Sequence, residues 1–240
     1  MQKKYTHLFF DLDNTLWDFK GNSKLALQST FLLLGLDRKE VSFDDFYAAY
    51  SRNNEQLWKA YRNKQVKKKD LTFQRFQFTF DELGISGVDA GRMNTLYLDE
   101  MPKQTNLIPG AKDLLDHLKA KNYQLYIITN GFSEVQHKKM KSSGLESYFN
   151  KTFISEEIRT PKPDPRIFEH ALKSSNAKKS KSLMIGDDWE VDVIGALRCG
   201  IDAVYFNPLH LPNDNSHNHA ERKIYGAFVV NHLKDIMELL

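Results

Sequence analysis

The amino-acid sequence predicts an α/β protein whose parallel sheet is interrupted, along the chain, by a long helical insertion. Short apolar strands alternate with helices over residues 104–240, which is the pattern of a parallel sheet covered by helices. Residues 22–101 instead show helical periodicity without a convincing strand, although one apolar strand precedes them. We therefore expect an α/β core domain of residues 1–16 and 104–240 and an all-helical domain of residues 17–103.

The first strand is expected at residues 5–10, which are apolar enough to be buried on both faces of a sheet. Helices of the insertion follow, with rings such as Phe46, Tyr50, Phe76 and Phe80 at helical spacing. Rings at this spacing are usually ordinary packing between helices and less often a platform for a nucleobase. Most of them should therefore form the core of the inserted domain.

The elements after the insertion alternate between strand and helix. Strands are expected at residues 124–129, 152–154, 182–185, 203–206 and 227–230, and helices from residues 109, 133 and 165 and over residues 190–199. Ser133 and Gln136 have the spacing of a capping box, and Asp164 precedes Pro165 as an N-cap before a proline at the first helical position. The carboxyl ends of these parallel strands should form the edge at which ligands bind.

Composition and charge exclude several classes of protein. With 34 Lys and Arg against 31 Asp and Glu, the net charge is only +3, which does not mark a nucleic-acid-binding protein. No apolar run approaches a membrane span, and the run near the N-terminus is too short for a signal-peptide core. The single cysteine, Cys199, forbids an internal disulfide and suits a small buried thiol. We expect a cytoplasmic protein with no nucleic acid, no membrane and no obligate protein as partner.

Histidines gather in residues 210–219, together with Asn213, Asp214 and Asn215. The spacing of these histidines fits no tetrahedral zinc template. We therefore expect a polar surface loop there.

Two carboxylates stand at the end of the first strand, because Asp11 and Asp13 directly follow its apolar run. Since side chains alternate along a strand, both would lie on one face, about 7 Å apart, if the chain stayed extended. Like charges this close need a cation to be tolerated. Acidic residues that merely end a strand are the simpler interpretation, so this pair needs support from elsewhere in the chain.

Two further segments carry groups that suit an anion. Thr129, Asn130 and Gly131 combine a hydroxyl, a flexible turn and the start of a helix, an arrangement for which phosphate is the natural guest. Lys162 lies between two prolines, which stiffen the backbone and reduce the entropy lost when its ammonium is held beside an anion. Each segment alone would also fit an ordinary loop.

A fourth segment places more carboxylates at a strand end, since the strand at residues 182–185 is followed by Asp187, Asp188 and Asp192. With the pair at residues 11 and 13, five carboxylates then face Lys162, and such a cluster is too negative to fold stably without divalent charge. Mg²⁺ prefers oxygen ligands and commonly shares its shell with a substrate phosphate. The four segments together predict magnesium-dependent phosphoryl chemistry.

The four segments, in this order, resemble the four motifs of the haloacid dehalogenase superfamily. The resemblance covers nearly the whole core, and the insertion is similar to the helical cap that follows the first motif in that superfamily. It implies a Rossmann-like parallel sheet with an inserted all-helical cap. It also implies an aspartyl-phosphate mechanism, in which Asp11 attacks phosphorus while Asp13, held protonated by its surroundings, protonates the leaving alkoxide and then activates water.

The resemblance implies ligand roles as well. Mg²⁺ would be held by Asp11, the backbone carbonyl of Asp13 and Asp187, with Asp192 and Asp188 in support. The phosphoryl oxygens would be held by Thr129, the amides of Asn130 and Gly131, and Lys162. Asp188 departs from the Thr or Ser that is usual in the superfamily, which leaves its role open.

An acid at position 13 favours a phosphatase, because a dehalogenase expels halide and needs no proton donor there. Residues 129–136 and 154–157 are similar to pyrimidine-directed nucleoside 5'-monophosphatases, which implies a small phosphorylated metabolite, a nucleotide, as substrate. A sugar-phosphate or phosphoglycolate-type phosphatase and a phosphomutase remain alternatives on the same core. A phosphate-ligand binding protein without turnover is the non-enzymatic alternative.

Overall fold

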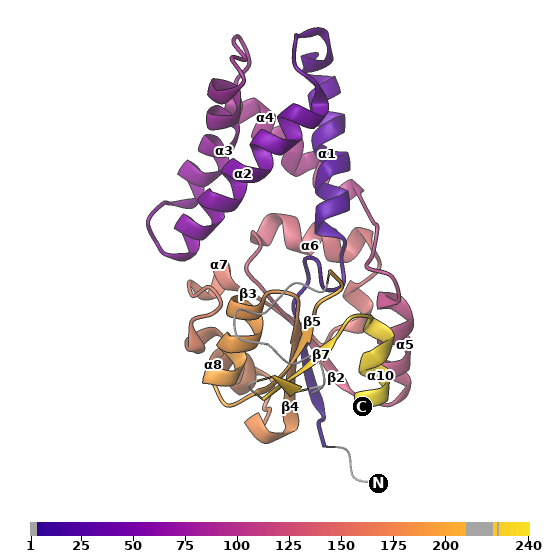
Figure 1. Cartoon of the computed structure of the whole chain (residues 1–240). Coiled ribbons are helices and arrows are strands. Elements are labelled where there is room, and N and C mark those ends of the chain that lie inside the picture. The colour runs from indigo at the N-terminus through magenta and orange to yellow at the C-terminus, as the bar shows by residue number, and fades with distance from the viewer. Residues whose placement is uncertain (1–3, 210–222, 225) are drawn as a thin grey trace. The chain divides into compact units, whose positions relative to one another are not determined.

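The computed structural model describes residues 4–209, 223–224 and 226–240 (Figure 1). The chain forms two compact units, one of residues 1–19 and 106–240 and one of residues 20–105. The first unit contains the sheet and is called the core, and the second is helical and is called the cap. Trp17 thus lies in the core, whereas the expected boundary after residue 16 placed it in the cap. The histidine-containing residues 210–219 lie outside the described part of the chain.

The core is built on a sheet with the strand order β3-β2-β1-β4-β5-β7-β6. The strands are β1 His7–Phe10, β2 Gln124–Thr129, β3 Lys151–Ile154, β4 Ser182–Gly186, β5 Asp202–Phe206, β6 Lys223–Ile224 and β7 Ala227–Val230. All paired neighbours are parallel except β6, which is antiparallel to β7. The predicted parallel α/β core is therefore confirmed, although β1 begins at His7 and is shorter than expected.

The position of β1 in the sheet determines where polar residues gather. Phe10, the last residue of β1, is paired with Ile127 of β2 and with Ile185 of β4. The chain builds β2 and β3 on one side of β1 and then returns to build β4 on the other, so the strand order reverses at β1. Ligands of open α/β sheets bind beyond the carboxyl ends of the strands at such a reversal. Residues that follow β1, β2 and β4 are brought together there.

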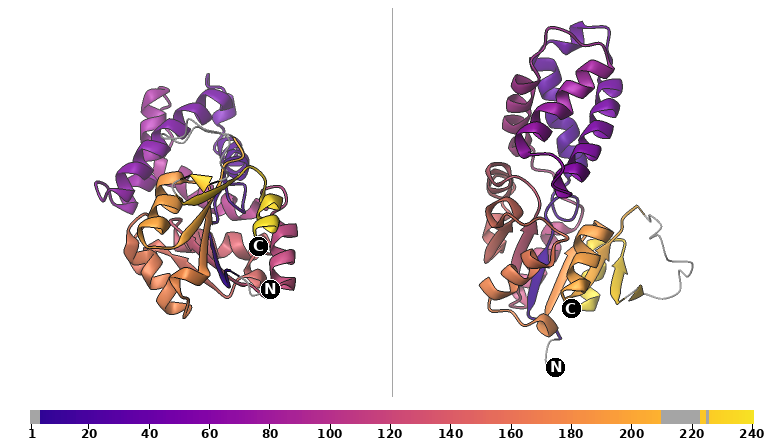
Figure 2. Two further views of the ribbon diagram at one scale, coloured as in Figure 1. Left: turned by 60° about the horizontal axis from the view of Figure 1, so that its bottom comes forward. Right: turned by 90° about the vertical axis from the view of Figure 1, so that its left-hand side faces the viewer.

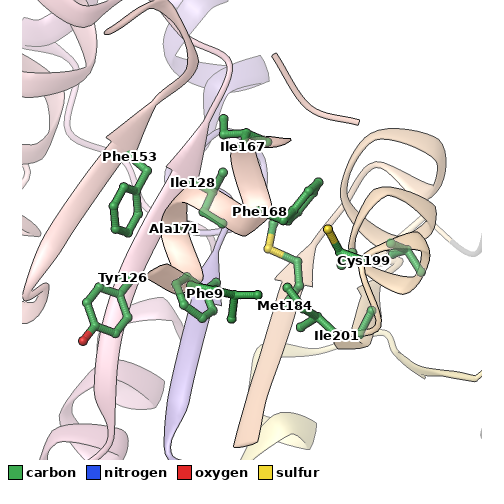
Figure 3. Packing of buried hydrophobic residues seen from close by; sticks show 14 of the residues in the cluster. Phe9, Tyr126, Ile128, Phe153, Ile167, Phe168, Ala171, Met184, Cys199 and Ile201 are labelled. Atoms are coloured by element: carbon green, nitrogen blue, oxygen red, sulfur yellow. The ribbon is translucent and has the colours of Figure 1, made fainter. Parts of the chain in front are cut away.

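Helices cover both faces of the core sheet (Figures 1 and 2). They are α5 Ala111–Ala120, α6 Ser133–Ser142, α7 Ser155–Ile158, α8 Pro165–Ser174, α9 Gly195–Arg198 and α10 Ile236–Leu239. On one face, Phe168 of α8 packs with Phe9 and Met184 of the sheet and with the buried Cys199 (Figure 3). The expectation of a small buried thiol is confirmed. Asp164 caps α8 by accepting a hydrogen bond from the Arg166 amide, as its position before Pro165 predicted.

The cap consists of α2 Phe43–Arg62, α3 Lys68–Glu82, α4 Ala90–Glu100 and most of α1 Phe19–Leu33. Phe46, Tyr50, Phe76 and Phe80 are all buried, and the ring centroids of Tyr50 and Phe76 lie 5.0 Å apart. The expectation that most of these rings form the core of the helical insertion is therefore confirmed. Within the described part of the chain, no helix combines the length and the apolarity needed to cross a membrane.

Candidate active site

The candidate site begins with the residues that follow β1 and β4. The Asp11 amide donates to the Ile185 carbonyl oxygen at 2.9 Å, so the chain keeps its place beside β4 for one residue beyond β1. Asp187 follows β4 in the same way, and its carboxylate accepts a hydrogen bond from the Thr15 hydroxyl at 3.2 Å. Both acids therefore stand at the carboxyl edge of the sheet because the two strands end together.

A buried ammonium lies among these acids. Lys162 Nζ donates to Asp11 Oδ1 at 2.5 Å, to Asp192 Oδ1 at 2.6 Å and to the Ile128 carbonyl oxygen at 2.7 Å. The three acceptors account for all three protons of the ammonium. Burial alone would lower the pKa of Lys162, but Asp11 and Asp192 raise the pKa above its ordinary value. The lysine is therefore charged, and its direction is fixed.

Asn130 holds the segment that carries this lysine. Its side-chain oxygen accepts from the Lys162 amide at 2.8 Å, and its side-chain nitrogen donates to the Lys162 carbonyl at 3.0 Å. This pair of hydrogen bonds joins the loop after β2 to the loop before α8. The side chain of Asn130 thus positions Lys162, a role that the sequence did not predict.

Three carboxylates lie close together, because oxygens of Asp11, Asp187 and Asp192 lie within 4.8 Å of one another. Burial, opposed by Lys162, raises the pKa of Asp11 from 3.8 to about 7. Burial and the nearby Asp11 carboxylate raise the pKa of Asp187 well above its ordinary value, and burial also raises the pKa of Asp192. One ammonium cannot balance two buried carboxylates and the half-buried Asp187, so this donor set of oxygens fits a divalent cation.

Asp13 belongs to a different set of contacts. Its Oδ1 accepts from Lys139 Nζ at 2.8 Å, and its Oδ2 accepts from Gln136 Nε2 at 2.9 Å. Two N–H donors, one of them charged, therefore face the carboxylate of Asp13, with one donor on each oxygen. That its surroundings hold Asp13 protonated for the first step stays a prediction.

The predicted capping box at the start of α6 is wrong. The N-cap of α6 is Phe132, and the Ser133 amide donates to Glu156 Oε2 at 2.9 Å. Gln136 instead turns its side chain into the site, where its amide nitrogen also donates to the Thr129 hydroxyl oxygen at 2.7 Å. Asp13 and Thr129 therefore replace the local acceptor that the spacing suggested for Gln136.

Thr129 is placed to act as a donor. Its Oγ1 accepts from Gln136 Nε2 and, at 3.2 Å, from the Gly131 amide. Among the hydrogen bonds of the described residues, none is donated by the Thr129 hydroxyl, so its proton is available to a ligand oxygen. A Cβ on Gly131 would overlap the side chain of Gln136, so the absence of a side chain at this position permits the arrangement.

The segment after β4 differs from the predicted helix of residues 190–199. Trp189–Ile194 forms a π-helical turn, and only Gly195–Arg198 are α-helical. Asp188 caps this turn through hydrogen bonds from the Glu190 and Val191 amides at 3.1 and 3.0 Å. The carboxylate of Asp188 therefore shapes the loop, which answers the question that its unusual identity raised.

Asp192 connects this loop to the lysine. Its Oδ2 accepts from the Asp188 amide at 3.2 Å, while its Oδ1 accepts from Lys162. A Cβ on Gly186 would overlap the Asp192 carboxylate, so a glycine at the end of β4 lets the carboxylate approach.

The order and geometry of these groups agree with the comparisons to known proteins. A family model described as haloacid dehalogenase-like hydrolase matches residues 5–200. The chain belongs to this family. It is a phosphoric monoester hydrolase of the haloacid dehalogenase superfamily, as the four motifs implied.

Three similar proteins of the haloacid dehalogenase superfamily stand out. The pyrimidine 5'-nucleotidase PynA of Streptococcus pneumoniae is 36% identical over 210 residues, which cover 87% of this chain and 86% of PynA. The pyrimidine 5'-nucleotidase YjjG of Escherichia coli is 33% identical over 208 residues, which cover 86% of this chain and 88% of YjjG. A crystal structure of the HAD-hydrolase YfnB of Bacillus subtilis bound to magnesium has a TM-score of 0.84 at 28% identity, with 99% of both chains covered.

Within this haloacid dehalogenase-like site, the sequence-based predictions did not include Lys139, and they assigned Gln136 to a local capping box. The two residues lie three apart on α6, a spacing that places both on one side of the helix. Nothing local marks Lys139, since basic residues also occupy positions 138 and 141 of the same helix. Its burial, which decides its role, comes from segments far away in the chain.

Proposed function

We propose that this phosphatase hydrolyses nucleoside 5'-monophosphates, with a preference for pyrimidine bases, through an aspartyl-phosphate on Asp11. The reaction type is supported by the buried arrangement of Asp11 against Lys162 at the edge of the sheet. The substrate class is supported by the 33–36% identity to two pyrimidine 5'-nucleotidases over 86–87% of the chain.

In the first step, Asp11 attacks phosphorus and the bond to the leaving oxygen breaks. Lys162 holds Oδ1 of Asp11, which leaves Oδ2 for the attack. The Thr129 hydroxyl and the Asn130 amide supply donors for the phosphoryl oxygens, the Gly131 amide lies beside Thr129, and the charged Lys162 adds positive charge next to Asp11. Asp13, protonated in the preceding turnover, gives its proton to the departing alkoxide.

In the second step, water attacks the aspartyl-phosphate. Asp13, now a carboxylate, takes a proton from this water, and the bond between phosphorus and Asp11 breaks to release inorganic phosphate. The proton that Asp13 gains here is the one that it gives to the next leaving group. In this step the donors Gln136 and Lys139 support Asp13 as a carboxylate.

Mg²⁺ fits the acidic cluster as a cofactor. Asp11, Asp187 and the backbone carbonyl of Asp13 would hold it, supported by Asp192, while Asp188 shapes the adjoining loop. When bound, the ion would supply positive charge that offsets the cluster and the phosphate of the substrate.

The acidic cluster makes the stability of the metal-free protein depend on pH. The pKa of Asp11 is 3.8 ordinarily and about 7 in the fold, so the folded state binds more protons between these values. The free energy of unfolding of the metal-free protein should therefore fall as pH rises from about 4 to about 7. Saturating Mg²⁺ should restore about 2–4 kcal/mol at pH 8 and clearly less at pH 5.5, where protons compete.

Thermal unfolding with and without Mg²⁺ at several pH values measures this linkage. Sodium chloride at equal ionic strength controls for screening, and Asp187→Asn should lose most of the response to Mg²⁺. An equal Mg²⁺ effect at both pH values, or a full effect in Asp187→Asn, would contradict a metal at this cluster.

The substrate class is tested by kcat/KM values for nucleoside monophosphates, sugar phosphates and phosphoglycolate. We expect the highest kcat/KM for a pyrimidine nucleoside 5'-monophosphate. An optimum for a sugar phosphate or phosphoglycolate would favour the first alternative, and a requirement for a bisphosphate activator would favour a phosphomutase. Binding of these esters without phosphate release would favour a binding protein.

A further inference from the structure

Asp13 has a buried lysine of its own, separate from the one that holds Asp11. The side chain of Lys139 is 3% exposed, and that of Asp13 is 23% exposed, so the lysine lies beneath the carboxylate. Lys139 Nζ also lies 4.3 Å from the ring centroid of Trp17 and 5.1 Å from that of Phe19. A lysine this buried requires a charged partner, and Asp13 supplies it.

A turn at the end of the first motif creates this packing. Asn14 adopts φ 61°, a left-handed conformation that asparagine tolerates, and its amide donates to the Trp17 carbonyl at 2.8 Å. The turn folds the wholly buried Trp17 back beside Asp13, where its ring covers Lys139. The same short segment thus provides both the carboxylate and an aromatic wall for the lysine that binds it.

Gln136 completes the contacts of Asp13. It is fully buried, and its Nε2 donates both to Asp13 Oδ2 and to the Thr129 hydroxyl oxygen. The amide nitrogen must face these two acceptors, because the amide oxygen would repel the carboxylate. Each oxygen of Asp13 therefore has one donor, and both donors come from α6.

We propose that Lys139 and Gln136 are positioning residues for Asp13, an inference that rests on the proposed acid–base role of this aspartate. Two donors on two oxygens stop rotation of the carboxylate and fix its place. Each oxygen keeps a second lone pair, so Asp13 can carry the transferred proton without losing either hydrogen bond. Gln136 also joins Asp13 to Thr129, which aligns the acid–base group with a donor for the phosphoryl oxygens.

The effect of Lys139 on kcat/KM should depend on the leaving group of the substrate. A lysine with a merely structural role would affect both kinds of substrate equally. Departure of a nucleoside alkoxide needs the proton of Asp13, whereas p-nitrophenolate is stable enough to leave without one. Lys139→Met should lower kcat/KM for the nucleotide about 100-fold and leave kcat/KM for p-nitrophenyl phosphate within about threefold of wild type. Lys139→Arg should recover part of the loss, because it restores a cation beside Asp13.

Lys138→Met is the matched control, since Lys138 is the exposed neighbour of Lys139 on α6 and loses the same charge. Both kcat/KM values should stay at the wild-type level in this variant. If Lys139→Met does not fold, the same two substrates can be compared in Gln136→Met. In this variant we expect kcat/KM for the nucleotide to fall about tenfold. An equal loss for both substrates, or no loss for either, would overturn the proposal.

Asp13→Asn separates this proposal from the one on which it depends. If Asp13→Asn discriminates between the two substrates and Lys139→Met does not, the acid–base role stands and the positioning role is wrong. If Asp13→Asn fails to discriminate, the acid–base role itself is wrong.

Discussion

Asp11→Asn is expected to reduce kcat at least about 10⁴-fold, the largest effect of any substitution in this protein. An amide cannot form the acyl phosphate through which the proposed reaction passes. The side-chain oxygen of asparagine still accepts a hydrogen bond from Lys162, so the loss reports missing chemistry and not a missing contact. When the wild type is quenched with acid during turnover of a substrate labelled at its phosphate, the label should be found on Asp11. The variant should carry no label.

Stability distinguishes this outcome from misfolding. Because burial raises the pKa of Asp11 to about 7, its charge at higher pH opposes folding of the metal-free protein. Asp11→Asn removes that charge and should raise the free energy of unfolding at pH 8, by at most about 4 kcal/mol. Asp113→Asn, an exposed acid in the first turn of α5, should leave activity unchanged and alter the free energy of unfolding by no more than about 1 kcal/mol. Turnover near the wild-type level in Asp11→Asn would end the covalent mechanism.

Lys162→Met should lower both activity and stability. Loss of a buried donor to the reacting groups should reduce kcat/KM about 10²–10³-fold. Without the ammonium, the carboxylates of Asp11, Asp187 and Asp192 face one another in a buried site. Removal of one partner from such a network should lower the free energy of unfolding of the metal-free protein by about 3–5 kcal/mol near pH 8.

Urea unfolding at two pH values checks this electrostatic cause. The destabilisation should shrink near pH 5, where protons neutralise the carboxylates, and adding Asp192→Asn should recover part of the stability at pH 8. Lys173→Met, an exposed lysine on α8, should stay within about 0.5 kcal/mol of wild type. A loss of stability in Lys162→Met that is independent of pH would point to packing as its cause.

The fold was largely predictable because its signals are local. Apolar runs marked the strands that the structure places at Gln124–Thr129 and Ala227–Val230, and Asp164 with Pro165 marked the start of α8. Acids directly after β1 and β4 share one edge because neighbouring parallel strands end there. For that reason the proximity of Asp11 and Asp187 could be expected from the sequence.

The partners of each charged group could not be predicted in this way. Gln136 has the spacing of a local cap, but it bonds Asp13 at a separation of 123 residues, and Lys139 pairs with the same aspartate at a separation of 126. The π-helical turn at Trp189–Ile194, whose first amides donate to the Asp188 side chain, was likewise predicted as an ordinary α-helix.

The sequence by itself determined the alternation of the main strands and helices, the aspartates at the ends of β1 and β4, and the superfamily. The tertiary structure alone decided which of the five expected acids bind Lys162 directly, namely Asp11 and Asp192, and that Lys139 binds Asp13. The physical reason is the distance along the chain over which each interaction acts. Periodicity and capping act over a few residues, whereas the partner of a buried charge depends on which distant segments the packed fold brings beside it.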